Sequence, residues 1–113
     1  MHEMSLAENI LEIIEETIPD SGEKKLLSVT VEVGKLAAVM PDSLQFCFET
    51  IIEDTPFRGA RLQIVEKPLS GYCPACQISF EIDNMLFSCP RCDSIEIRIN
   101  GGQELQLTEL EVE

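Results

Sequence analysis

Residues 73–92 read CPACQISFEIDNMLFSCPRC, and this stretch governs how the rest of the chain is organised. It contains two Cys-x-x-Cys pairs, Cys73 with Cys76 and Cys89 with Cys92, separated by twelve residues. A Cys-x-x-Cys turn directs two thiolates at one point, and two such turns that face each other complete a tetrahedron of sulfur ligands. The intervening segment is long enough for a β-hairpin that brings the turns together. We therefore predict a four-cysteine metal site.

Zinc is the metal that four thiolates favour, because a redox-inert ion with four sulfur ligands is a common structural solution. Iron is the alternative metal, and it would colour the protein red. The pairs could also be redox-active dithiols of the thioredoxin kind, but such a pair usually begins a helix that follows a strand, and this context is missing here. With every position filled by protein, the zinc would have no open position for catalysis.

Two segments before the cysteines have the periodicity of amphipathic helices. Apolar residues recur three or four positions apart from Met4 to Ile18, which predicts a helix that ends at Pro19, followed by a turn over residues 20–22. A second helix is predicted from Pro41, since proline fits the first helical turn, and it should end before Pro56. Cys47 lies on the apolar stripe of this second helix, where a lone thiol acts as core filler.

Other segments alternate apolar and polar residues, as half-buried strands do. The main strands are predicted at residues 27–34, 61–67 and 103–111. In the last of them the phase slips at Glu109-Leu110, which indicates a bulge or a fraying end. Shorter strands are predicted at residues 78–82 and across Ile95, Ile97 and Ile99, the latter broken by Gly101-Gly102.

These elements predict an α+β fold in which two helices pack on one face of a small three-stranded sheet, with a zinc-ribbon-like lobe inserted before the last strand. Residues 1–69 plus 101–113 would form the main domain, and residues 70–100 the zinc-binding domain. About 30 residues cannot bury enough apolar surface to fold alone, so the metal must hold the inserted lobe.

The overall composition limits the classes of function. The 113 residues carry 8 Lys plus Arg against 21 Asp plus Glu, a formal net charge of −13. Such a surface repels phosphate backbones, which argues against nucleic-acid binding and favours cationic partners. No apolar run approaches the roughly 18 residues that a membrane span needs. Because no basic and apolar export signal opens the chain and the thiols are paired for a metal, we expect the protein in the cytosol.

His2 is the only histidine, and it stands next to the N-terminal amine. The simplest interpretation is a solvated terminal residue. The functional interpretation is a chelate, because the amine of Met1, the backbone nitrogen of His2 and its imidazole Nδ1 can close two fused rings around one ion. Three nitrogens in one plane suit Ni²⁺ or Cu²⁺. The fourth position stays open to Glu3, through its carboxylate or amide, to water, or to a partner's side chain.

Three features taken together resemble the HypA/HybF family of nickel metallochaperones. They are MHEMSL at residues 1–6, VEVGKL at residues 31–36 and the paired-cysteine lobe, and they follow the family's order from end to end. The resemblance implies that nickel is cargo and zinc is structural. It implies nickel bound by Met1, His2 and Glu3, and zinc bound by Cys73, Cys76, Cys89 and Cys92. It also implies work with the HypB GTPase and delivery to the large subunit of a [NiFe] hydrogenase, and some relatives serve urease.

This chain departs from the family in one respect. Many relatives carry further histidines, some near the zinc turns, whereas His2 stands alone here. A nickel geometry that needs a second imidazole from the same chain is therefore excluded. We expect the first helix to meet the GTPase, because the nickel site abuts it.

Two other functions are alternatives to that of a nickel carrier. One is a zinc-ribbon protein-interaction module whose N-terminus is inert. The other is an enzyme, which we do not expect, because the sequence has no Ser/His/Asp or Cys/His arrangement and no glycine-rich phosphate loop.

Overall fold

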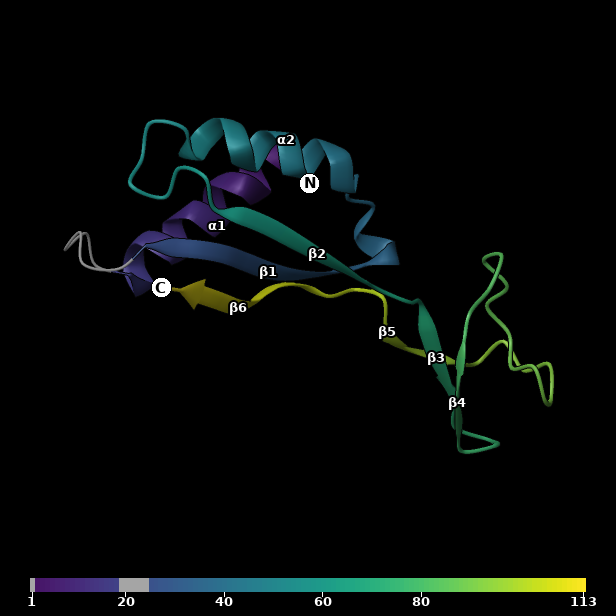
Figure 1. The fold of residues 1–113 in the computed structure, drawn as a ribbon. Coiled ribbons are helices and arrows are strands. Elements are labelled where there is room, and N and C mark those ends of the chain that lie inside the picture. Colours follow the sequence, from purple (N-terminus) through teal and green to yellow (C-terminus); the bar gives the residue numbers. More distant parts are fainter. Residues whose placement is uncertain (1, 19–24) are drawn as a thin grey trace.

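The computed structural model describes residues 2–18 and 25–113, in which two helices cover one of two three-stranded sheets (Figure 1). The elements in chain order are α1 (Glu3–Thr17), β1 (Leu26–Gly34), a short 3₁₀ turn η1 (Lys35–Ala37), α2 (Pro41–Ile52), β2 (Arg61–Lys67), β3 (Ser70–Cys73), β4 (Ile78–Glu81), β5 (Arg98–Gly101) and β6 (Leu105–Val112). The predicted α+β class is confirmed.

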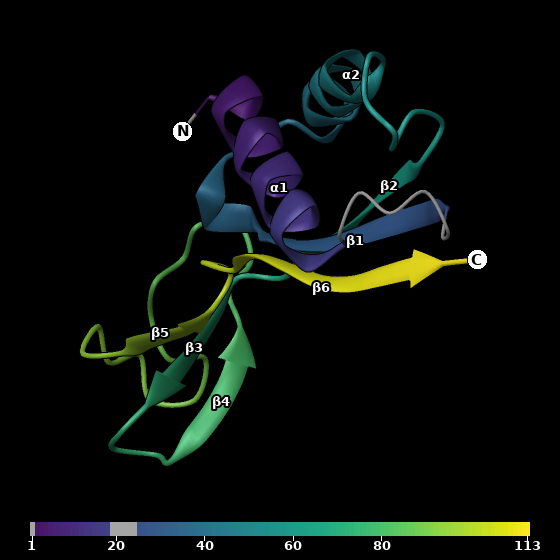
Figure 2. The same cartoon turned by 90° about the vertical axis from the view of Figure 1, so that its left-hand side faces the viewer.

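The first sheet has the strand order β2-β1-β6, with β1 parallel to β2 and antiparallel to β6. Both helices lie on the same side of this sheet, α1 nearer β6 and α2 nearer β2 (Figure 2). Along β1, Val29, Val31 and Val33 are buried under the helices, as the alternation predicted for a strand covered on one face. At the start of the strand the prediction was wrong, because Leu26 is buried there and Leu27 is only half-buried. The main core is contributed by Leu6, Ala7, Ile10, Ile14, Leu26, Val29, Val31, Val33, Leu44, Phe48, Ile52, Phe57, Ala60 and Leu62.

The helix boundaries follow the sequence pattern closely. α1 ends at Thr17, just before the predicted limit, and the predicted turn at residues 20–22 lies outside the described residues. α2 begins at Pro41 as predicted and ends at Ile52, ahead of Pro56. The side chain of Cys47 is half-buried and packs against the core, as predicted for a filler.

The phase slip predicted in the last strand corresponds to an irregular register between β1 and β6. Thr30 pairs with Glu109 and Val31 pairs with Leu107, which leaves Thr108 without a partner as a bulge. A second irregularity lies between Leu26 and Ser28. The bulge lets the strand return its next leucine, Leu110, to the core side.

The second sheet has the order β4-β3-β5, and both outer strands run antiparallel to β3. One expectation about it was wrong. The alternation at Ile95 and Ile97 is not a strand, since β5 begins only at Arg98 and Ile95 is 81% exposed. The break predicted at Gly101-Gly102 is confirmed, since Gly101 is the last residue of β5 and still pairs with Ser70.

β3 is the strand that the sequence did not indicate, because Gly71 has the character of a strand breaker. In the structure Gly71 is buried at the centre of the second sheet. A Cβ there would meet the side chains of Ile82 and Phe80 at 3.2 and 3.3 Å. Because glycine has no side chain, the side chains of Ile82 and Phe80 can pack directly against the backbone of β3.

The two sheets lie end to end, so that the molecule measures 57 × 22 × 16 Å (Figure 1). Its radius of gyration is 17.8 Å, well above the roughly 13 Å of a compact chain of this length. Among the described residues, no helix combines the length and apolar character needed to cross a bilayer.

Candidate metal centre and N-terminal site

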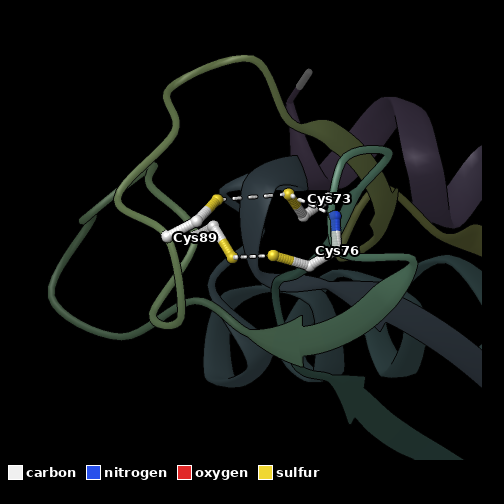
Figure 3. Close-up of side chains that lie close together, drawn as sticks. Cys73, Cys76 and Cys89 are labelled. Carbon is white, nitrogen blue, oxygen red and sulfur yellow. Dashed lines mark hydrogen bonds between the residues drawn. The ribbon is translucent and has the colours of Figure 1, made fainter.

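The four paired cysteines converge on one point in the second lobe, residues 70–100. Figure 3 shows how three of them, Cys73, Cys76 and Cys89, point toward one another. Their Sγ atoms all lie within 4.8 Å of one another, with 3.7 Å between Cys73 and Cys92 and 4.0 Å between Cys76 and Cys89. A zinc ion bound by four thiolates at about 2.3 Å separates its sulfur ligands by about 3.8 Å. The cluster therefore has the size that tetrahedral zinc requires.

Each Cys-x-x-Cys pair is held by the same kind of backbone turn. The N–H of Gln77 donates to the carbonyl of Cys73 at 2.7 Å, and the N–H of Asp93 donates to the carbonyl of Cys89 at 2.9 Å. Gln77 and Asp93 both adopt left-handed φ values, 56° and 59°. The two turns have the same backbone conformation, begin sixteen residues apart in the sequence, and each presents a pair of sulfur atoms.

Backbone N–H groups also point at the sulfur atoms. The N–H of Cys76 lies 3.5 Å from the Sγ of Cys73, and that of Arg91 lies 3.4 Å from the Sγ of Cys89. Donors of this kind stabilise thiolates, which are the ligand form of cysteine.

The pKa values of the cysteine thiols differ within the cluster. The side-chain hydrogen bond with Cys92 and burial raise the pKa of Cys76 to about 12. Burial also pushes the pKa of Cys89 upward, but the N–H groups of Cys92 and Arg91 outweigh it and lower that pKa to about 7. One thiolate therefore forms readily while its neighbour keeps a proton, because negative charges so close together repel each other. A bound cation removes this repulsion.

The cysteines are also a large part of the buried interior of the second lobe. Cys73 and Cys89 are fully buried, Ile82 is the other buried hydrophobic side chain of residues 70–100, and Leu69 is buried directly before β3. So small an apolar interior cannot hold a sheet of three short strands, which favours a structural metal.

The predicted nickel ligands lie at the start of α1, in the first lobe, which contains the β2-β1-β6 sheet and both helices. His2 is exposed and is the N-cap residue of α1, and its carbonyl accepts a hydrogen bond from the N–H of Leu6 at 3.1 Å. The structure gives its side chain no capping hydrogen bond. Met1 lies outside the described residues, so the predicted chelate of its amine with His2 stays a prediction.

Glu3 makes a contact that the sequence did not predict. The hydroxyl of Ser43, in the first turn of α2, donates to the Oε1 of Glu3 at 3.3 Å. This hydrogen bond ties the start of α1 to the start of α2. It joins residues forty positions apart, and only the packing of the two helices brings them together.

Comparison with known proteins agrees with these features. The family model described as hydrogenase/urease nickel incorporation, metallochaperone, HypA matches residues 1–112. Hydrogenase maturation factor HypA 2 of Bradyrhizobium diazoefficiens is 42% identical, and HypA of Geobacter metallireducens 41% identical, each over the whole of both chains.

Solved structures give the same result. The solution structure of the Ni metallochaperone HypA from Helicobacter pylori covers 98% of this chain and 97% of its own, with a TM-score of 0.67 and 27% identity. A second structure, titled as the solution structure of HypA protein, has a TM-score of 0.73 at 27% identity, and the match covers 98% of this chain and 95% of that one. Since the match in sequence and in fold spans both lobes, this chain belongs to the HypA family of nickel-incorporation metallochaperones.

Proposed function

We propose that this protein binds Ni(II) at its N-terminus and delivers it for the maturation of a [NiFe] hydrogenase. The observation that carries the proposal is the placement of the only imidazole, His2, exposed at the first turn of α1 and on the lobe that lacks the sulfur cluster. An exposed site at the end of a chain suits the transfer of an ion, whereas the four-cysteine cluster suits its permanent retention.

The proposed nickel ligands are Met1 through its amine, His2 through its backbone nitrogen and imidazole Nδ1, and Glu3. Planar nitrogen donors of this kind suit Ni²⁺. The hydrogen bond from Ser43 holds the Glu3 carboxylate against the first turn of α2, close to the start of α1. Because a nitrogen must be free of its proton to bind, nickel affinity should fall as the pH falls.

The proposed zinc ligands are Cys73, Cys76, Cys89 and Cys92. The sulfur separations fit tetrahedral zinc, and four protein ligands leave the ion no open position. Zinc in this role supplies folding energy to the second lobe and takes no part in the transfer chemistry.

The proposed partners are the HypB GTPase and the large subunit of a [NiFe] hydrogenase. The name of the matched family supports a link to hydrogenase maturation and leaves urease as a further recipient in relatives. The net charge of −13 favours partners with basic surfaces.

The experiment that tests the proposal is a nickel titration of the untagged protein and of the His2→Ala variant. The variant should lose stoichiometric nickel binding while its zinc content and circular dichroism stay unchanged. Met4→Ala is the matched control, since Met4 is an exposed apolar residue of the same helical turn and lies outside the ligand set. Unchanged nickel affinity in His2→Ala would refute the carrier role and favour the zinc-ribbon interaction module.

A further inference from the structure

α1 and the edge strand β6 enclose an apolar groove. Its volume is about 420 Å³. Its lining includes Leu6, Glu12 and Ile13 of α1 and Leu105 and Leu107 of β6. The floor belongs to β1 and β6, and the wall belongs to the side of α1 that faces β6 (Figure 2). Ile13, on this wall, is 41% exposed.

β6 ends the first sheet, because the strand order is β2-β1-β6. An edge strand presents unpaired backbone N–H and C=O groups to solvent. Leu105, Leu107 and Leu110 point to the helix side, where they pair with core residues of β1, but they remain only half-buried. A fourth strand beside β6 would place its own alternate side chains beneath α1 and complete the cover of these leucines.

The charged residues of α1 and β6 are all acidic. α1 and residues 103–113 contain no lysine or arginine. Glu12 stands on the groove wall, and Glu109, which pairs with Thr30, lies on the opposite face of the sheet together with Glu111. On the opposite face, Lys25 and Arg61 line a hollow together with Glu111 at the C-terminal end of β6. Near its other end Lys67 pairs with Glu32, which accepts a hydrogen bond from Gln106.

We propose that this groove receives an extended segment of a partner protein, in which apolar and basic residues alternate, and that the segment adds to β6 as a fourth strand. Its apolar side chains lie against Ile13 and Leu107, and its basic side chains lie beside Glu109 on the other face, because side chains alternate between the two faces of a strand. A second copy of this chain is a poorer occupant, since pairing β6 with β6 would set glutamates against glutamates.

The groove begins at Leu6, whose N–H donates to the carbonyl of His2. A segment bound there therefore ends beside the N-terminal site. The nearness of this segment to nickel rests on the proposed function. Binding of the segment in the groove does not depend on it. The test accordingly uses zinc-loaded, nickel-free protein, so that its outcome is separate from any result on nickel.

The experiment measures the binding of short synthetic peptides to the full chain by amide chemical-shift perturbation. A peptide that alternates valine with lysine should bind about tenfold more tightly than one that alternates valine with glutamate, with shifts at β6 and at the groove side of α1. A valine-lysine peptide N-methylated on alternate residues should lose binding, because it cannot pair with a strand edge. Equal binding of the glutamate or the N-methylated peptide would overturn the proposal.

A variant separates apolar contact from simple charge attraction. Ile13→Asp adds a negative charge, which alone would strengthen the binding of a basic peptide, yet it should weaken binding about fivefold or more by removing the apolar wall. Phe46→Asp, at an exposed apolar position of α2 outside the groove, is the matched control and should leave the affinity unchanged. Undiminished binding in Ile13→Asp, or a dimer of the free protein that Ile13→Asp dissociates, would contradict a basic partner strand.

Discussion

At the scale of single residues, Gly34 joins two parts of the chain that are distant in sequence. Gly34 lies where residues 102–104 cross the end of β1, with its N–H donating to the carbonyl of Glu104 at 2.7 Å. A Cβ on Gly34 would collide with the backbone of Gly102. The glycine of the VEVGKL motif is therefore needed for close approach of two backbones.

Gly34→Ala should destabilise the protein by about 3 kcal/mol, because backbone atoms must move to make room for the methyl group. Gly59→Ala is the control, since a Cβ there meets nothing within 4 Å and its cost comes only from a φ of +88°. That cost is about 1 kcal/mol. Urea unfolding checks both values, and equal losses in the two variants would contradict the steric explanation.

Ser43→Ala should weaken nickel binding about two- to tenfold, because it removes the hydrogen bond that the Ser43 hydroxyl donates to the Glu3 carboxylate. Nickel titration followed by absorbance measures the change. Ser5→Ala, at an exposed position of α1, should bind nickel as the parent does. If Ser43→Ala also binds as the parent does, Ser43 has no positioning role.

At the scale of elements, periodicity identified α1, α2, β1, β2 and β6, because each buries one face against a shared core. The bulge at Thr108 could be anticipated as well, since it changes the phase of the leucines. The second lobe was harder to predict. Its strands are four residues long and have little core to bury. As a result β3 left no periodic signal, and the alternation of Ile95, Ile97 and Ile99 placed the start of β5 too early.

Some features of the candidate sites could be predicted from the sequence and others could not. The four cysteines could be predicted to converge because their ligand geometry is local to two turns. The contact of Ser43 with Glu3 could not, because it depends on how two helices pack. The groove beside β6 was equally hidden, since it depends on which strand ends the sheet.

Cys73→Ser should release zinc and unfold the second lobe while the first lobe stays folded. The reason is that two of the few buried side chains of the lobe, Cys73 and Cys89, are themselves ligands in our proposal. Metal analysis and amide hydrogen exchange measure the effect, with loss of protection confined to β3, β4 and β5. Cys47→Ser is the control and should keep its zinc, and a protected second lobe in the zinc-free variant would contradict a structural metal.

Zinc binding at pH 7 should release at least two protons. The pKa of Cys76 is raised to about 12 and that of Cys92 is raised as well, so both thiols hold their protons at this pH until the metal displaces them. Zinc affinity should consequently fall as the pH is lowered. Calorimetry in buffers of different ionisation enthalpy counts the protons, and release of fewer than two would show that the thiolates exist before the metal binds.

At the scale of the whole molecule, the two sheets are joined by the short segments around Leu69 and Gly102, and a Cβ on Gly102 would press against Leu69. We propose that residues 1–69 plus 101–113 and residues 70–100 are the two domains. β5 extends to Gly101, so the boundary on that side falls at the end of a strand. The arrangement keeps the proposed cargo site and the structural metal on separate lobes.

Removing zinc with a chelator should raise the radius of gyration above 17.8 Å, because only the second lobe would expand. Small-angle X-ray scattering measures this, and addition of zinc should restore the original value. Collapse of the helical circular dichroism on chelation would mean that the two lobes fold as one unit and would contradict the proposed division.

The most direct test of the account is nickel titration of the untagged protein with and without acetylation of its N-terminal amine. Acetylation leaves the imidazole, the cysteines and the fold intact but removes the amine donor. The free-amine protein should bind one equivalent of nickel with a square-planar absorption band, and acetylation should abolish both the band and the binding. Equal affinity and an unchanged band in the acetylated protein would contradict it.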